Sequence, residues 1–146
     1  MNKKEKGMEI FSQGYNCAQA VAGAFAEEIG KPFEEITKTV SPFGGGMGRM
    51  REVCGAVSGM FFVLGALEGY DSPNQEKKKE LYATVQKLAE EFKKETGSII
   101  CSELLGLQEK QSDPTPDERN ETYYKVRPCK ELVGIACEIL ENYLSK

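Results

Sequence analysis

Residues 53–67 read VCGAVSGMFFVLGAL, the most apolar stretch of the 146-residue chain, and they lie between the charged residues Arg51 and Glu68. A stretch of this length is too short to cross a bilayer comfortably. A helix that is hydrophobic on every side belongs in the interior of a soluble domain. We therefore predict that a helix over about residues 51–68 forms the buried centre of the fold.

Helical signals continue on both sides of this stretch. Asn16 is a predicted N-cap, Gly30 a predicted helix stop, and Ser72 followed by Pro73 predicts the start of the longest helix. Residues 107–126 read as a long loop, in which residues 122–126 are a weak strand candidate. We expect helices over residues 3–12, 17–29, 32–40, 51–68, 72–97 and 128–144, and a short helix capped by Ser98 that runs through Cys101 to Leu105.

These signals predict one all-α domain over residues 1–146, a compact bundle of about six helices around the central apolar helix. A line of small side chains, Ala18, Ala22 and Ala26, is expected to pack closely against Gly55 and Gly59. A chain of this size buries enough surface to fold without disulfides. Its five cysteines therefore need another explanation.

The charge and the residue types exclude several classes of function. The net charge is −4, with lysines interleaved among glutamates, so nucleic acid is not an expected partner. The chain has no histidine, which removes the commonest general base and the commonest nitrogen ligand for metals. No apolar segment follows the charged residues 1–6 as it would in a secretory signal, so we expect a cytoplasmic protein that does not enter a membrane.

The five cysteines are scattered along the chain and form no CxxC pair. Cys17, Cys101 and Cys129 fall in the first turn of a predicted helix, and Cys54 lies about one turn into the apolar helix. Unpaired N–H groups and the positive end of the helix dipole stabilise a thiolate there, which lowers the pKa of the cysteine. We expect these four to be functional. Cys137 lies on the apolar stripe of the last helix and is expected to be a core residue.

A glycine-rich stretch, SPFGGGMGRMR at residues 41–51, leads into the apolar helix. Such a loop can turn several backbone N–H groups toward one ligand, and its arginines add positive potential. It matches neither of the common glycine motifs that bind nucleotides. We predict that the loop borders the cysteine site and contributes to binding there through Gly44, Gly45, Gly46, Gly48, Arg49 and Arg51.

Three segments, YNCAQAV at 15–21, FGGGMG at 43–48 and CGAVSG at 54–59, are followed by Cys101 and Cys129. Together they resemble the C_GCAxxG_C_C family, whose name implies redox activity, over nearly the whole chain. The resemblance implies that the four defining cysteines of the family are Cys17, Cys54, Cys101 and Cys129, with Cys137 as an extra one. It does not specify the reaction.

Three functions fit these residues. In the leading hypothesis the four cysteines gather at one pocket and transfer electrons by reversible thiol–disulfide exchange, without a cofactor, as in a thiol-dependent oxidoreductase. The partner is a redox protein or a small thiol. In the second hypothesis the same four thiolates bind an iron–sulfur cluster or zinc. In the third, the chain is a helical scaffold or binding module, able to dimerise through an apolar face, and its cysteines are incidental.

Thiol exchange ranks above a metal cluster on sequence grounds. Common cluster motifs bring at least two ligands from one short segment, whereas these cysteines come from different helices. A disulfide requires two Cα atoms about 4.4–6.8 Å apart. Because the line of small residues lets two helices approach closely, it predicts Cys17 with Cys54 as the pair.

Overall fold

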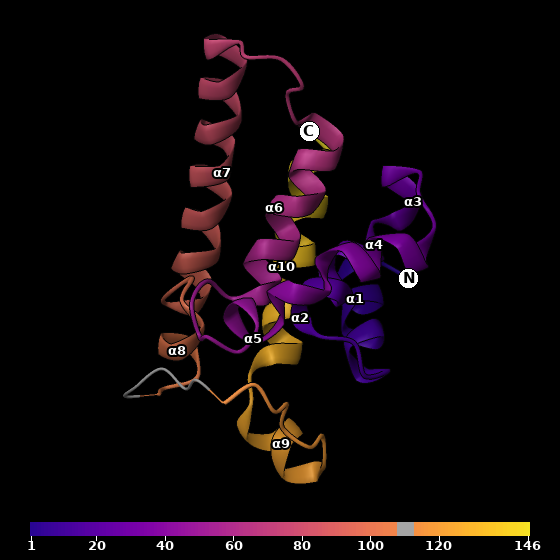
Figure 1. The fold of residues 1–146 in the computed structure, drawn as a ribbon, viewed down its shortest axis with the longest axis vertical. Helices are drawn as coiled ribbons and strands as arrows, with labels where there is room; N and C mark the ends of the chain where they lie inside the picture. The colour runs from indigo at the N-terminus through magenta and orange to yellow at the C-terminus, as the bar shows by residue number, and fades with distance from the viewer. Residues whose placement is uncertain (108–112) are drawn as a thin grey trace.

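Figure 1 shows the computed structural model, which describes residues 1–107 and 113–146. Within these ranges the chain is helical and forms no strand, apart from one isolated antiparallel bridge between Val53 and Ile100. The predicted all-α class is confirmed. The elements are α1 (Lys3–Ser12), α2 (Cys17–Ala24), α3 (Ala26–Ile29), α4 (Phe33–Val40), the 3-10 turn η1 (Ser41–Phe43), α5 (Gly44–Met47), α6 (Gly55–Glu68), α7 (Gln75–Thr96), α8 (Cys101–Leu104), α9 (Glu121–Val126) and α10 (Cys129–Leu144).

The helix that follows Asn16 begins as predicted and ends earlier. The Asn16 side chain accepts a hydrogen bond from the Gln19 N–H at 2.9 Å, and the Gln19 side chain accepts one from the Asn16 N–H at 3.0 Å. Helix α2 ends at Ala24, because the backbone leaves the helical region at Phe25, whose side chain is buried in the core. The helix expected over 17–29 is therefore two helices, and Gly30, with a φ of 79°, ends the second.

Two helices share the interior of the fold. Helix α2 packs against α1, α4, α6 and α10, while α6 packs against α2, α7 and α10. The α2–α6 contact is close, since a Cβ added at Gly59 would lie 2.8 Å from the carbonyl oxygen of Ala18. One added at Gly55 would lie 3.1 Å from the Cβ of Cys17. Small side chains thus allow the approach that the sequence predicted, and the core is built around α2 and α6 together (Figure 1).

Helix α6 begins at Gly55, about one turn later than predicted. The preceding residues pair instead with the segment before α8: the Cys54 N–H donates to the Ile99 carbonyl at 2.8 Å, and the Cys101 N–H donates to the Glu52 carbonyl at 2.6 Å. Cys54 is consequently the N-cap residue of α6 rather than a residue inside it. These bonds hold the start of α6 beside the start of α8.

Residues 44–51, predicted only as a loop, form a turn of left-handed backbone. The φ angle is positive throughout residues 45–49 and again at Arg51. Glycine adopts this conformation freely. Met47, Arg49 and Arg51 have φ angles of 67°, 69° and 62°, in a region that costs a side-chain-bearing residue about 1–2 kcal/mol. The turn closes on itself, because the N–H groups of residues 49, 51 and 52 donate to the carbonyls of residues 44, 45 and 46.

The starts of α7 and α8 differ from the prediction in which residue stands at the N-cap. Asn74 caps α7 by accepting a hydrogen bond from the Lys77 N–H at 3.0 Å, so the helix begins at Gln75 and not at Ser72. Before α8, the Ser98 hydroxyl donates to the Glu103 carboxylate and accepts from the Ile100 N–H. Ser98 therefore stabilises the connection, and the N-cap residue of α8 is Ile100.

The segment predicted as a loop with a weak strand contains a helix. The Asn120 side chain accepts a hydrogen bond from the Tyr123 N–H at 2.9 Å and so caps α9, which makes the strand candidate at 122–126 wrong. Residues 108–112 of that predicted loop lie outside the described residues. In the described ranges, no helix combines the length and the apolar composition needed to cross a membrane.

Candidate functional site

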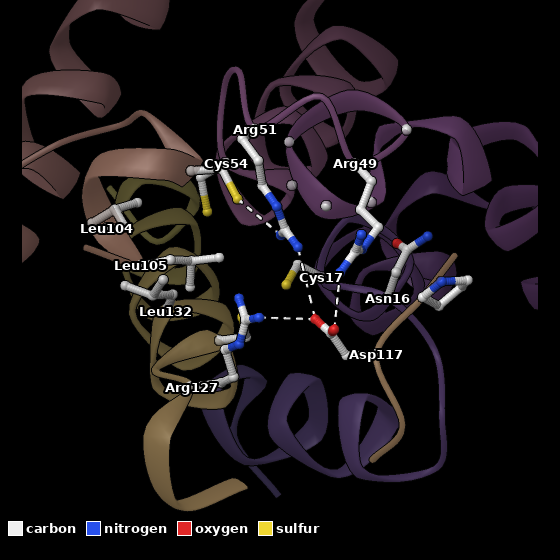
Figure 2. Close-up of a pocket in the computed structure, with 18 of the residues that line it drawn as sticks. Asn16, Cys17, Arg49, Arg51, Cys54, Leu104, Leu105, Asp117, Arg127 and Leu132 are labelled. Carbon is white, nitrogen blue, oxygen red and sulfur yellow. Dashed lines mark hydrogen bonds and ion pairs between the residues drawn. The ribbon is translucent and has the colours of Figure 1, made fainter. Parts of the chain in front are cut away.

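A cavity of about 410 Å³ lies where four helices begin. The four cysteines predicted to be functional line it: Cys17, Cys54, Cys101 and Cys129. Cys17, Cys101 and Cys129 are the first residues of α2, α8 and α10, and Cys54 is the residue that precedes α6. The sequence reasoning placed these cysteines near helix starts. The structure brings the four starts to one place, and Figure 2 shows Cys17 and Cys54 there together with the arginines discussed below.

Cys17 and Cys129 influence each other's ionisation. The largest influence on the pKa of Cys129 is hydrogen bonding with the Cys17 thiol, which lowers it, and Tyr123 and the nearby Arg127 and Arg51 act in the same direction. The pKa of Cys129 is thereby lowered to about 7. The pKa of Cys17 is raised well above its ordinary value, because its proton is held in that hydrogen bond and its side chain is buried. Cys129 is therefore the first of the pair to ionise.

Cys54 and Cys101 are less easily ionised. Burial raises the pKa of Cys54 to about 12, although the N–H groups of Ala56 and Val57 at the start of α6 oppose that shift. Burial also raises the pKa of Cys101, against the influence of Arg51, whose Nη1 donates to the Cys101 sulfur at 3.6 Å. At neutral pH both residues are thiols.

The glycine turn forms one wall of the cavity, and Gly44, Gly45, Gly46, Gly48, Arg49 and Arg51 all line it. A Cβ at Gly46 would lie 2.6 Å from the Cβ of Cys101, so glycine permits the close approach of the turn to α8. The N–H groups of Arg49 and Arg51 donate to carbonyls of the same turn. The sequence suggested that backbone N–H groups of this turn face the site. At Arg49 and Arg51 those N–H groups are used within the turn, and the two residues line the cavity.

The Asp117 carboxylate, which lines the cavity, forms ion pairs with three arginine side chains (Figure 2). Its carboxylate oxygens lie 2.8 Å from Nη2 of Arg49, 2.9 Å from Nη2 of Arg127 and 3.7 Å from Nη2 of Arg51. Arg119, another lining residue, donates to the carbonyl of Phe11 and, at 2.6 Å, to that of Tyr15. These contacts attach the segment before α9 to the rest of the domain.

Sequence reasoning did not identify Asp117, Tyr123, Arg119 or Arg127 as site residues. Arg127 stands two positions before Cys129, at the start of a predicted helix, and that spacing was a usable signal. Asp117 and Tyr123 lie in the segment predicted as a loop, and no local pattern distinguishes them.

Cys137 lies outside the cavity, as predicted. Its side chain is fully buried, and burial raises its pKa to about 12. It packs where α10 meets α1, and a Cβ added at Gly7 would lie 2.5 Å from its sulfur.

Among the residues that the structure describes, no three cysteine, aspartate or glutamate side chains are grouped so that they could hold a metal ion.

Comparison with known proteins gives one match. Residues 15–143 match the model of the C_GCAxxG_C_C family, described as "Putative redox-active protein (C_GCAxxG_C_C)". No curated protein and no solved structure matches the chain. The matched range contains the four cavity cysteines and the glycine turn.

Proposed function

Because the chain belongs to the C_GCAxxG_C_C family of redox-active proteins, we propose that it carries out reversible thiol–disulfide exchange, with Cys129 as the nucleophile and Cys17 as the resolving thiol. The observation that carries this proposal is the convergence of Cys17 and Cys129 on one cavity, where interaction between the two thiols lowers the pKa of Cys129 and raises that of Cys17. This arrangement stabilises a thiolate on one residue and keeps the second thiol within reach of it.

The properties of the two thiols fit these roles. The thiolate is the attacking form of cysteine, and an attacking thiol works best when its pKa is near the ambient pH. Cys129, with a pKa lowered to about 7, meets that requirement. It is also the least buried of the four, since Cys17, Cys54 and Cys101 are all buried.

The reaction balances as a two-electron exchange. The Cys129 thiolate attacks one sulfur of a substrate disulfide, which forms a mixed disulfide and releases the first substrate thiol. Cys17 then gives up its proton and attacks the Cys129 sulfur, which releases the second substrate thiol and leaves a Cys17–Cys129 disulfide. The substrate disulfide is reduced and the protein dithiol is oxidised; a cellular dithiol reverses the change.

This proposal replaces the Cys17–Cys54 pair that the sequence suggested. Burial raises the pKa of Cys54 to about 12, whereas the strongest influence on the pKa of Cys17 is its interaction with Cys129. We assign Cys54 and Cys101 no bond-forming role in the first exchange. We further propose a cytoplasmic setting, because an odd number of cysteines without CxxC motifs is typical of proteins in a reducing compartment.

Peptide mapping after mild oxidation tests the proposal. Reduced protein is treated with 2-hydroxyethyl disulfide, the remaining thiols are alkylated, and the peptides are analysed by mass. We expect a linked pair containing Cys17 and Cys129 in the native protein, and a mixed disulfide trapped on Cys129 in Cys17→Ser. Cys137→Ala serves as the control and should behave like the native protein.

Two results would contradict the proposal. A Cys17–Cys54 link would restore the pair suggested by the sequence. Stoichiometric iron and acid-labile sulfide, or zinc, in protein purified anaerobically would favour the alternative in which Cys17, Cys54, Cys101 and Cys129 bind a metal centre.

A further inference from the structure

Arg51 is a buried cation whose hydrogen-bonding capacity is largely unused. The residue is 4% exposed, and its side chain lines the cysteine cavity. Nη1 contacts only the weakly accepting sulfur of Cys101 at 3.6 Å, and the Asp117 carboxylate is 3.7 Å from Nη2. No acceptor within residues 1–107 and 113–146 takes a hydrogen bond from its buried Nε. A guanidinium has five N–H donors, and burying them without partners is costly.

The charge of the cavity is opposite to that of the protein. The charged groups among its described lining residues are Arg49, Arg51, Arg119 and Arg127, against the carboxylate of Asp117. The whole chain carries −4. Asp117 is itself partly exposed and is the acceptor for Arg49 and Arg127 at hydrogen-bond distance. Positive charge therefore exceeds negative charge beside the reactive sulfur.

We propose that this cavity selects small disulfides that carry a negatively charged group, which binds to Arg51 and Arg49 while Cys129 attacks the sulfur–sulfur bond. The inference rests on the proposed function, because it names the class of disulfide that the protein exchanges with. A volume of about 410 Å³ suits a small molecule. Arginine binds carboxylates and oxyanions with paired N–H donors, and Arg51 has such donors available.

The position of Asp117 supports the same conclusion. Its carboxylate occupies the place where the three guanidinium groups converge (Figure 2). A carboxylate held there shows that the cluster accommodates this type of anion. An anionic substrate would compete with Asp117 for Arg49 and Arg51, so Asp117 should weaken the selection that the arginines provide.

The first test compares iodoacetate with iodoacetamide as alkylating agents for Cys129. The two differ by a carboxylate in place of an amide, and neither requires a redox reaction. For each reagent, the alkylation rate of Cys129 is divided by the rate at which the same reagent alkylates the free thiol dithiothreitol. The difference in intrinsic reactivity between the two reagents then cancels. We expect the iodoacetate-to-iodoacetamide ratio to be about tenfold higher for the protein than for the free thiol, the size of one charge-assisted hydrogen bond.

Variants assign the effect to particular residues. Arg51→Gln should lower the ratio toward that of the free thiol, whereas Asp117→Asn should raise it. Lys79→Gln removes one positive charge from an exposed site on α7 and should leave it unchanged. Because both reagents attack the same thiolate, a change in the pKa of Cys129 alters both rates together and leaves the ratio unaffected. If Arg51→Gln does not fold, Asp117→Asn still decides, since an unchanged or lower ratio there contradicts the inference.

The second test measures the rate at which the protein reacts with three disulfides of similar size, each divided by the rate for dithiothreitol. The three are dithiodipropionate with two carboxylates, neutral 2-hydroxyethyl disulfide, and cystamine with two ammonium groups. We expect the order anionic, neutral, cationic, from fastest to slowest. Equal normalised rates in both tests would overturn the anion selection and leave the exchange function standing. An alkylation preference without reaction with any disulfide would overturn the exchange function, and with it the assignment of disulfides as substrates.

Discussion

Cys17, the first residue of α2, and Cys129, the first residue of α10, line the same cavity, where hydrogen bonding between the two thiols raises the pKa of Cys17 and lowers that of Cys129. The two residues lie in distant parts of the sequence, and the packing of α2 against α10 brings them together. The interaction moves the two pKa values in opposite directions. Cys129 loses its proton first and Cys17 retains it.

The first prediction concerns the pH dependence of Cys129. Its alkylation by iodoacetamide should rise with pH around a midpoint near 7, following its lowered pKa. Cys17→Ala removes the donor that stabilises the thiolate, so the midpoint should move upward by about one pH unit, the equivalent of one hydrogen bond. Cys137→Ala is the control and should keep the native midpoint. A lower midpoint in Cys17→Ala would contradict the assigned direction of the hydrogen bond.

The second prediction concerns the core around Cys137. Cys137→Ala should lower the free energy of unfolding by about 1–2 kcal/mol, because it removes a buried sulfur and leaves a small cavity. Gly7→Ala should also destabilise, since its new Cβ would lie 2.5 Å from that sulfur. The double variant should be more stable than the sum of the two losses implies. Additive losses in denaturant unfolding would show that the two positions are not in contact.

The third prediction concerns alkaline pH. Burial raises the pKa of Cys137 to about 12 in the folded protein, whereas the unfolded thiol ionises near about 8.5. Above that pH the unfolded state loses the proton that the folded state keeps, so stability should fall as the pH rises toward 12. The fall should be smaller in Cys137→Ala than in the native reduced protein, as measured by denaturant unfolding at pH 8 and pH 10. Parallel curves for the two proteins would speak against a buried thiol at this position.

The fourth prediction separates two effects at the glycine turn. Gly46→Ala should destabilise by about 2–4 kcal/mol, through the left-handed backbone and through contact of the new Cβ with Cys101 and with the backbone of residues 51 and 52. Gly48→Ala is the matched control, because its φ of 60° is similar and its nearest neighbouring atom is 3.9 Å away. It should cost about 1–2 kcal/mol from the backbone alone. Equal losses would mean that the close contacts with Cys101 and with the backbone of residues 51 and 52 do not limit the size of residue 46.

The elements that the sequence predicted well are those specified by local interactions. Helix α1, the cap at Asn16 and the stops at Gly30 and Gly97 depend on neighbours a few residues away, and they appear at or near their predicted positions. The start of α6 was predicted about a turn too early because residues 52–54 form hydrogen bonds with residues 99–101 instead of continuing the helix. That partner is distant in sequence and leaves no periodic pattern.

In the candidate site too, features set by local sequence could be predicted and features set by distant contacts could not. The chemistry of cysteine and the helix-start positions indicated Cys17, Cys101 and Cys129 as functional candidates, and the structure brings them with Cys54 to one cavity. Which two sulfurs pair depends on how the helices cross. The small-residue line suggested Cys54 as the partner of Cys17, whereas our proposal pairs Cys17 with Cys129. Asp117 could not be recognised as a site residue from the sequence. What distinguishes it from other aspartates in polar segments is its ion pairs with arginines that are distant in the chain or outside any local motif.

The packing of α10 against α1 and α2 has a consequence for how reactivity arises during folding. The strongest influence on Cys129 comes from Cys17 in α2, near the other end of the sequence, and Tyr123 and Arg127 come from the segment just before α10. Contacts of such long sequence separation form slowly, since much of the chain must be ordered first. Until α10 has docked, Cys129 keeps the proton affinity of an ordinary thiol. The lowered pKa of Cys129 is thus a property of the docked helices, and on the proposed function the nucleophile is activated only in the folded domain.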